Sequence, residues 1–168
     1  MGPVTCFSLC LLGCLIFNPS LAAGAQAASC PRGWLHFHND CYGYFPQEAT
    51  WKRAEARCQS YGSGAHLASI HSEEEHNAVA DFITRSQRHD DDDDDGDDVW
   101  IGLHTPARSR RWSWADGSEL DFSAWGSHRS SSSPKGEPCV VLEEDTGFVT
   151  WDKDSCNDRN PFVCKFRP

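Results

Sequence analysis

Six cysteines spread through residues 30–168 constrain the fold of this chain more than any other feature of its sequence. They are Cys30, Cys41, Cys58, Cys139, Cys156 and Cys164. Three further cysteines lie in residues 1–29, a stretch without a single Asp, Glu, Lys or Arg. In an exported protein an even number of cysteines indicates a disulfide framework, although spacing alone does not choose among the many pairings.

Residues 1–27 are typical of a secretory signal peptide. The apolar run Cys6–Phe17 has 12 residues, too few to cross a bilayer, which needs about 20. A turn follows at Asn18-Pro19-Ser20, and Ala23-Gly24-Ala25 or Ala25-Gln26-Ala27 offers a cleavage site. The alternative is a buried N-terminal helix, which would usually show a polar face. We expect a secreted protein without a membrane segment.

The formal charge of −10 is concentrated in one segment. Residues 90–98 hold eight aspartates and one glycine, and without them 17 acids face 15 bases, a charge of −2. The eight are Asp90, Asp91, Asp92, Asp93, Asp94, Asp95, Asp97 and Asp98. Nucleic acid and anionic membranes are excluded as expected partners, because both require concentrated positive charge.

Residues 30–168 have the pattern of an α+β domain, in which two helices are followed by a run of strands. Thr50 is expected to cap a helix that ends near Gln59. Ser72 and Glu75 form a capping box for a second helix, which fades near Gln87. Strands are expected at 34–37, 41–45, 99–103, 112–114, 139–142, 148–151 and 161–166, with an irregular stretch at 118–138.

These segments resemble, in order, the C-type-lectin-like domain over essentially all of residues 30–168. The likeness rests on Cys30-x3-Trp34, Cys41-Tyr42, Trp51–Cys58, Trp100-Ile101-Gly102-Leu103, Trp112-x-Trp114-x-Asp116-Gly117, Cys139, Trp151-x4-Cys156 and Phe162-Val163-Cys164. The resemblance implies two helices, antiparallel sheets and a long loop. It also implies the disulfide pairing Cys30–Cys41, Cys58–Cys164 and Cys139–Cys156.

Two groups within this family are similar to the chain. Cys41–Phe45, Gly64–Ile70 and Trp100–His104 resemble the Reg secreted lectins, which bind glycans, including microbial ones, without the usual calcium site. Trp51–Ala56, Ile70–His76 and the acidic insert look more like eggshell matrix proteins of the struthiocalcin, dromaiocalcin, ansocalcin and ovocleidin type. The second likeness implies a protein of the extracellular eggshell matrix that associates with calcium carbonate and modulates biomineralisation.

The calcium and sugar motif of the lectin family is degenerate in this sequence. Sugar-binding members carry Trp-Asn-Asp where this chain has Trp151-Asp152-Lys153, so an ammonium stands where a ligand oxygen is needed. Their Glu-Pro-Asn loop triplet has no counterpart, because Glu137-Pro138 adjoins Cys139 and Ser133-Pro134-Lys135 offers no carboxylate. We expect no defined metal site at Asp152 and Lys153 and no obligatory cofactor.

The aspartate tract has two interpretations. Its carboxylates ionise well below neutral pH, and in an extended chain those on one side recur about every 6–7 Å. Such an array suits many weakly held Ca²⁺ ions or a crystal face, whereas no EF-hand pattern surrounds it. From charge alone, a solvated run that keeps the protein soluble is favoured. The eggshell resemblance favours mineral binding instead.

Several other residues also have two interpretations. Ser72 is a candidate phosphorylation site as well as a helix cap. Arg108, Arg110 and Arg111 either face carbonate or form a solvated hairpin. Most of the seven tryptophans are expected in the core, and Trp125 is the least explained. No catalytic motif is present, so no enzyme is predicted, and no odd cysteine remains, so we expect a monomer or weak self-association.

Overall fold

The computed structural model describes residues 29–88, 96–127 and 134–168. The predicted signal peptide, residues 1–27, lies outside these residues and stays a prediction. The described elements, in order, are β1 (Leu35–Phe37), β2 (Asp40–Ala49), α1 (Trp51–Gln59), β3 (His66–Leu67), α2 (Glu73–Gln87), β4 (Val99–His104), β5 (Ser113–Trp114), β6 (Pro138–Leu142), the 3-10 helix η3 (Glu144–Thr146), β7 (Trp151–Ser155) and β8 (Asn160–Phe166).

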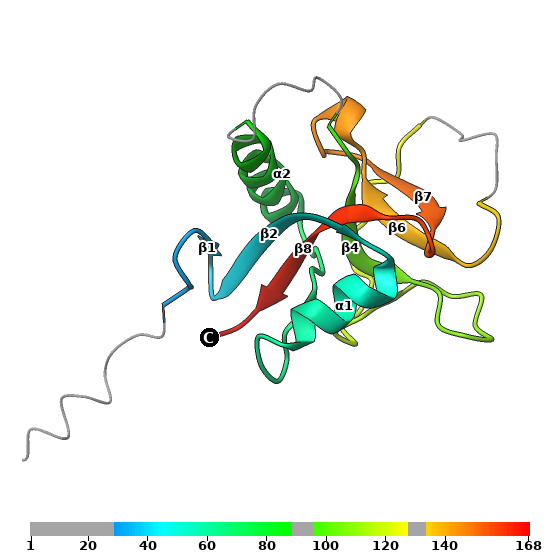
Figure 1. Ribbon diagram of the computed structural model, residues 1–168, viewed down its shortest axis with the longest axis horizontal. Helices are drawn as coiled ribbons and strands as arrows, with labels where there is room; N and C mark the ends of the chain where they lie inside the picture. The colour runs from blue at the N-terminus through cyan, green and yellow to red at the C-terminus, as the bar shows by residue number, and fades with distance from the viewer. Residues whose placement is uncertain (1–28, 89–95, 128–133) are drawn as a thin grey trace, which may run out of the picture.

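The strands form one sheet in the order β1-β2-β8-β4-β6-β7, with β3 added on β8 and β5 on β4. The early strand β2 and the last strand β8 are antiparallel neighbours, which brings the two ends of the domain together (Figure 1). The pair β4 and β8 is parallel, with Trp100 opposite Phe162. The sheet is therefore mixed: its other strand pairs are antiparallel, as expected, and β4 with β8 is the parallel pair among the named strands described.

Both predicted helices are present with their predicted caps. Thr50 Oγ1 accepts a hydrogen bond from the Arg53 N–H at 3.4 Å, and Ser72 Oγ accepts one from the Glu75 N–H at 3.1 Å. The reciprocal half of the predicted capping box differs, because the Glu75 carboxylate accepts from the His71 N–H, at 2.7 Å, instead of from Ser72. Side-chain capping satisfies amide donors that the first helical turn leaves unpaired.

Strand β4 divides the core into two layers. Val99, Ile101 and Leu103 point to the face covered by α2, whereas Trp100 points to the face covered by α1. Alternate side chains of a strand lie on opposite faces, so a continuous apolar run is buried on both sides. No side chain fits at position 102, because a Cβ on Gly102 would lie 2.5 Å from the Leu67 carbonyl oxygen.

Three disulfides join Cys30 to Cys41, Cys58 to Cys164 and Cys139 to Cys156, which confirms the pairing implied by the family resemblance. The second bridge spans 106 residues and ties α1 to β8. On the chain-entropy model, a loop of this length is worth about 4–5 kcal/mol. The third bridge fixes the ends of β6 and β7, beside the long loop.

One predicted strand is misplaced. Residues 148–151 were expected to be extended, but the strand begins at Trp151 and runs to Ser155. Phe148 instead follows η3 with a φ of 65°, and its N–H donates to the Glu143 carbonyl oxygen at 2.9 Å. Residues 148–150, which hydrophobicity alone assigns to a strand, therefore form the bend between η3 and β7.

Candidate functional site

The two aspartates of the acidic tract that the structure describes lie at the start of β4. Asp97 is exposed and Asp98 is half-buried, while Asp90–Asp95 lie outside the described residues. Gln87, the last residue of α2, donates from Nε2 to the Asp97 carbonyl oxygen at 3.5 Å. The end of α2 and the start of β4 are therefore in contact, and the tract connects them.

A second acidic segment lies against the start of β4. The Glu144 N–H donates to Asp98 Oδ1 at 2.8 Å, and a Cβ on Gly96 would lie 2.6 Å from Glu144 Cγ. Figure 1 shows η3, in orange, beside the first residues of β4. We call this group of side chains the acidic edge; its members are Asp97, Asp98, Glu143, Glu144 and Asp145. The last three were not predicted as site residues, although three consecutive acids are visible in the sequence.

The carboxylates of the acidic edge have no cationic partner among the residues that the structure describes. Among the described residues, none of the five forms an ion pair with Lys, Arg or His. Burial raises the pKa of Asp98, and the neighbouring carboxylates of Glu143, Asp145 and Asp154 raise it further. The Glu144 N–H opposes this shift by stabilising the ionised form. Within the described part of the chain, the acidic edge is therefore a cluster of negative charges without an ion-pair partner.

The degenerate calcium motif lies on β7. Asp152 accepts a hydrogen bond at Oδ1 from the N–H of Lys153 at 2.8 Å. Lys153 is exposed, and its Nζ lies 5.9 Å from the centre of the Trp125 ring. In the part of the chain that the structure describes, no three His, Cys, Asp or Glu side chains are grouped so that they could hold a metal ion.

A groove borders Lys153. It lies between the loop that follows β4, which carries Arg108, Arg110 and Trp112, and the residues that enter β6, which include Glu137. Its volume is about 490 Å³. Arg111 does not line it. The groove and the acidic edge lie at opposite ends of β4, a strand whose six residues span about 20 Å. Arg108 and Arg110 therefore lie at the other end of β4 from the acidic edge.

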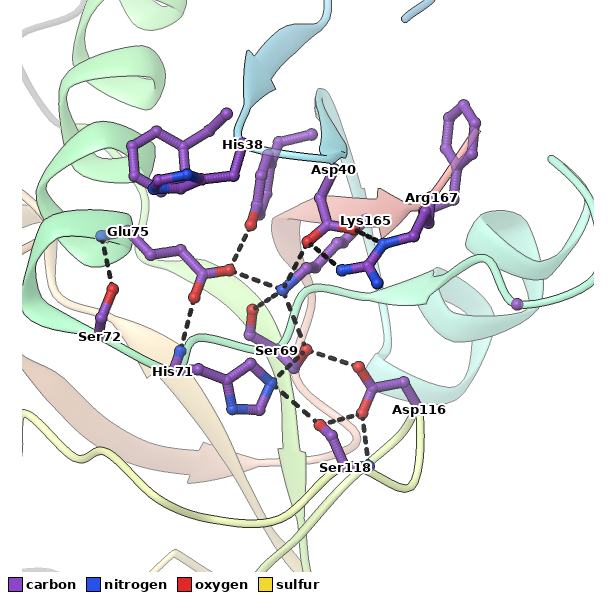
Figure 2. Close-up of a pocket in the computed structure, with 14 residues that line it drawn as sticks. His38, Asp40, Ser69, His71, Ser72, Glu75, Asp116, Ser118, Lys165 and Arg167 are labelled. Atoms are coloured by element: carbon purple, nitrogen blue, oxygen red, sulfur yellow. Dashed lines mark hydrogen bonds and ion pairs between the residues drawn. The ribbon is translucent and has the colours of Figure 1, made fainter. Parts of the chain in front are cut away.

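Ser72 is exposed and lines a polar cavity of about 480 Å³ (Figure 2). It lies at the start of α2, and the acidic edge lies near the end of that helix. A helix of 15 residues is about 22 Å long, so Ser72 is remote from the tract. The structure does not bring these two predicted sites together, and phosphorylation of Ser72 stays a prediction.

The polar cavity is lined by side chains that form ion pairs and hydrogen bonds with one another. Lys165 Nζ lies 2.6 Å from Glu75 Oε1 and 3.8 Å from Asp40 Oδ2, and the Tyr42 hydroxyl also donates to Glu75. Arg167 Nε lies 3.0 Å from Asp40 Oδ1. The charged groups of this network neutralise one another, which indicates a structural role.

Ser118, His71 and Asp121 form a chain that has the residue order of a catalytic triad. Ser118 Oγ lies 3.1 Å from His71 Nε2, and His71 Nδ1 lies 2.7 Å from Asp121 Oδ1. However, the hydroxyls of Ser118 and Ser69 both donate to the carboxylate of Asp116. Each hydroxyl hydrogen is therefore used toward Asp116 and not toward His71 Nε2. The imidazole is not placed to act as a general base toward serine.

The sequence of this chain is related to known proteins over most of its length. The family model of the lectin C-type domain matches residues 47–166. The chain belongs to the C-type lectin domain family. Within this lectin family, struthiocalcin-2 of Struthio camelus is 47% identical over 143 residues, which cover 84% of this chain and 99% of that protein. Regenerating islet-derived protein 4 of Homo sapiens is 38% identical over 160 residues, which cover 95% of each.

A solved lectin-family structure supports the same assignment. The structure of ovocleidin-17, a major protein of the Gallus gallus eggshell calcified layer, matches with a TM-score of 0.71 and 37% identity. The match covers 83% of this chain and all of that one. The predicted family, fold and likeness to both the eggshell and the Reg groups are thus confirmed. Within the described residues, no helix is long and apolar enough to cross a membrane.

Proposed function

We propose that this C-type lectin-like protein is a component of an eggshell-type mineralised matrix and associates with calcium carbonate through its Asp-rich tract. The observation that carries the proposal is the acidic edge. Two segments far apart in the sequence, Asp97–Asp98 and Glu143–Asp145, converge without any ion pair to a described cation. The likeness to struthiocalcin-2, and to ovocleidin-17 from a calcified eggshell layer, supports it.

The chemistry of the acidic edge suits a mineral surface better than a single bound ion. Carboxylate oxygens are the hard ligands that Ca²⁺ prefers, and a tight protein site surrounds the ion with six to eight of them. The Glu144 N–H holds the Asp98 carboxylate, so the two acidic segments are fixed against each other on a disulfide-braced domain. A crystal face offers a regular array of Ca²⁺ to which many such groups bind weakly and together.

We also propose where the protein acts and what it binds. The protein is exported by the predicted signal peptide and acts in the extracellular matrix. Its partners are calcium carbonate and other matrix components, with weak association of several Ca²⁺ ions and no obligatory cofactor. The strong negative charge disfavours nucleic acid and anionic membranes. No catalytic step is part of this function.

Growth of seeded calcite in the presence of the mature protein tests the proposal. We expect wild type to change the growth rate or the crystal shape at low concentration. A variant with serine at Asp90–Asp95 and Asp97 should lose most of this effect. Asp98 is retained because its carboxylate anchors Glu144. If wild type and this variant change the rate and shape of calcite growth equally, the tract has no role in mineral binding.

Glycan binding without the family's calcium site is a second candidate function. The groove beside Lys153 favours it, because Trp112 lines the groove and packs against Trp125 with ring centres 5.3 Å apart. Trp125 in turn lies edge-on to Trp151, 5.6 Å away. Trp112, packed against Trp125, provides a firm aromatic surface for the apolar face of a sugar.

A further inference from the structure

Strand β7 lies at an edge of the described sheet, since it comes last in the order of the strands, next to β6. Main-chain groups of alternate residues in a strand point to the same side. The Trp151 N–H donates to the Ala124 carbonyl oxygen at 2.9 Å, and the Trp151 carbonyl oxygen accepts from the Gly126 N–H at 3.1 Å, both on the side away from β6. The main-chain groups of Lys153 and Ser155 therefore also point away from β6. We call these groups the outer edge of β7.

Both N–H groups of the outer edge are capped by a carboxylate of the preceding residue. The Lys153 N–H donates to Asp152 Oδ1 at 2.8 Å, and the Ser155 N–H donates to Asp154 Oδ1 at 2.9 Å. A strand edge with unpaired N–H groups is a template for another strand. The two aspartates occupy the donors that an added strand would need.

The cap on Ser155 belongs to a fixed arrangement. The second oxygen of Asp154, Oδ2, accepts from Nδ2 of the buried Asn160 at 3.0 Å. The carboxyl group of Asp158 also hydrogen-bonds to Asp154, and this contact raises the pKa of Asp158. Asp154 is therefore held against the end of β7 by more than its own cap.

The same carboxylates oppose pairing with a second copy of the chain through their charge. When two β7 strands pair antiparallel through their outer edges, residues with outward-pointing groups lie opposite each other. Lys153 then meets either Lys153 or Ser155 of the second copy. The first register places Asp152 opposite Asp154, and the second places Asp154 opposite its own copy. Opposite side chains have Cβ atoms about 4.5–5.5 Å apart, and like charges at this distance destabilise the pair.

We propose that Asp152 and Asp154 block the addition of a second copy of this chain to the outer edge of β7. The caps occupy the N–H donors, and the repulsion between carboxylates disfavours the registers that include Lys153. A second copy is the partner that fits the edge once the carboxylates are removed, because two-fold pairing offers each strand the same donors and acceptors. This inference does not depend on mineral or glycan binding.

Sedimentation velocity of the mature protein at neutral pH tests the inference. We expect D152A/D154A to dimerise at least about tenfold more tightly than wild type, because two main-chain donors become available and the repulsion is lost. E48A/D81A removes two exposed carboxylates elsewhere and should sediment like wild type. Near-UV circular dichroism checks that each variant is folded. If D152A/D154A does not fold, D152A replaces it, with a smaller shift in the same direction.

A proline in the aspartate variant locates the contact. D152A/K153P/D154A lacks one outward-pointing N–H and keeps the hydrogen bonds to β6, so it should return to the wild-type association constant. D152A/K153Q/D154A loses only the lysine charge and should still dimerise. The proposal is overturned if removing the aspartates does not tighten association, or if E48A/D81A associates equally. It is also overturned if the proline and glutamine variants dimerise alike.

Discussion

Glu75 is a buried carboxylate that joins three parts of the domain. It accepts hydrogen bonds from the Tyr42 hydroxyl on β2, the His71 N–H before α2 and Lys165 Nζ on β8. Figure 2 shows His71 and Lys165 beside its carboxylate. The sequence predicted Glu75 only as part of a local helix cap. Its partners on β2 and β8 are distant in sequence, and no local pattern reveals them.

Replacing Glu75 by glutamine tests this role. The neutral amide would leave Lys165 with only the more distant carboxylate of Asp40, at 3.8 Å, and breaking a buried ion pair typically costs about 3–5 kcal/mol. We expect Glu75→Gln to lower the free energy of unfolding by about 3 kcal/mol in urea denaturation. Glu74→Gln, at the exposed neighbouring position, should change it by less than about 0.5 kcal/mol. Similar values for the two variants would contradict the account.

His76 makes stability depend on pH. Burial lowers the pKa of His76, although the Phe148 carbonyl and the carboxylates of Glu73 and Glu75 act in the opposite direction. Below about pH 6.5 the unfolded chain takes up a proton on this ring while the folded chain does not, so the free energy of unfolding falls as the pH decreases. Burial also lowers the pKa of His104, which stacks on Trp51, and adds to the effect.

NMR titration of the imidazoles checks this sign directly. We expect the resonances of His76 and His104 to titrate below pH 6.5, and the urea midpoint to fall between pH 7.5 and pH 5.5. A His76 resonance that titrates above pH 6.5 would show that the folded state favours the charged ring, which contradicts the burial argument.

At the scale of the elements, most of the fold could be predicted because its signals are local. The helix caps at Thr50 and Ser72 and the apolar run of β4 are short patterns with direct physical causes. The two-residue strand β3 and the helix η3 lack such signals. Both depend on neighbours: β3 exists through its pairing with β8, and Asp98 holds the first turn of η3.

The contact between β3 and β4 depends on Gly102. Its N–H donates to the Ala68 carbonyl oxygen at 2.8 Å, and a Cβ there would meet the Leu67 backbone. We expect Gly102→Ala to destabilise the domain by about 1–3 kcal/mol, because two backbones would have to separate. Ser113→Ala on the adjacent strand β5 is the control, with an expected change below about 0.5 kcal/mol in the same thermal or urea unfolding. Equal stability of Gly102→Ala and wild type would contradict the close approach.

At the scale of the whole molecule, the sequence gives charge composition but not the arrangement of charges. The acidic tract and the arginines near residue 110 are separated by only about ten positions. Strand β4 separates the two kinds of charge. The negative charge of Asp97 and Asp98 lies on the acidic edge at the start of β4, and the positive charge of Arg108 and Arg110 lies in the groove beyond its end. Glu143–Asp145 reach the acidic edge only through the fold. For this reason, the sequence could predict the tract but not the surface around it.

The central claim is that the position of the acidic residues, and not the total charge, produces mineral binding. Adsorption isotherms on calcite for two charge-matched variants test it most directly. D90S/D91S/D92S/D93S removes four carboxylates from the tract, and E48Q/E74Q/D81N/E119Q removes four exposed ones elsewhere. We predict that the tract variant loses at least about tenfold in affinity while the second variant binds like wild type. Equal affinity of the two variants, whether unchanged or reduced, would contradict the claim.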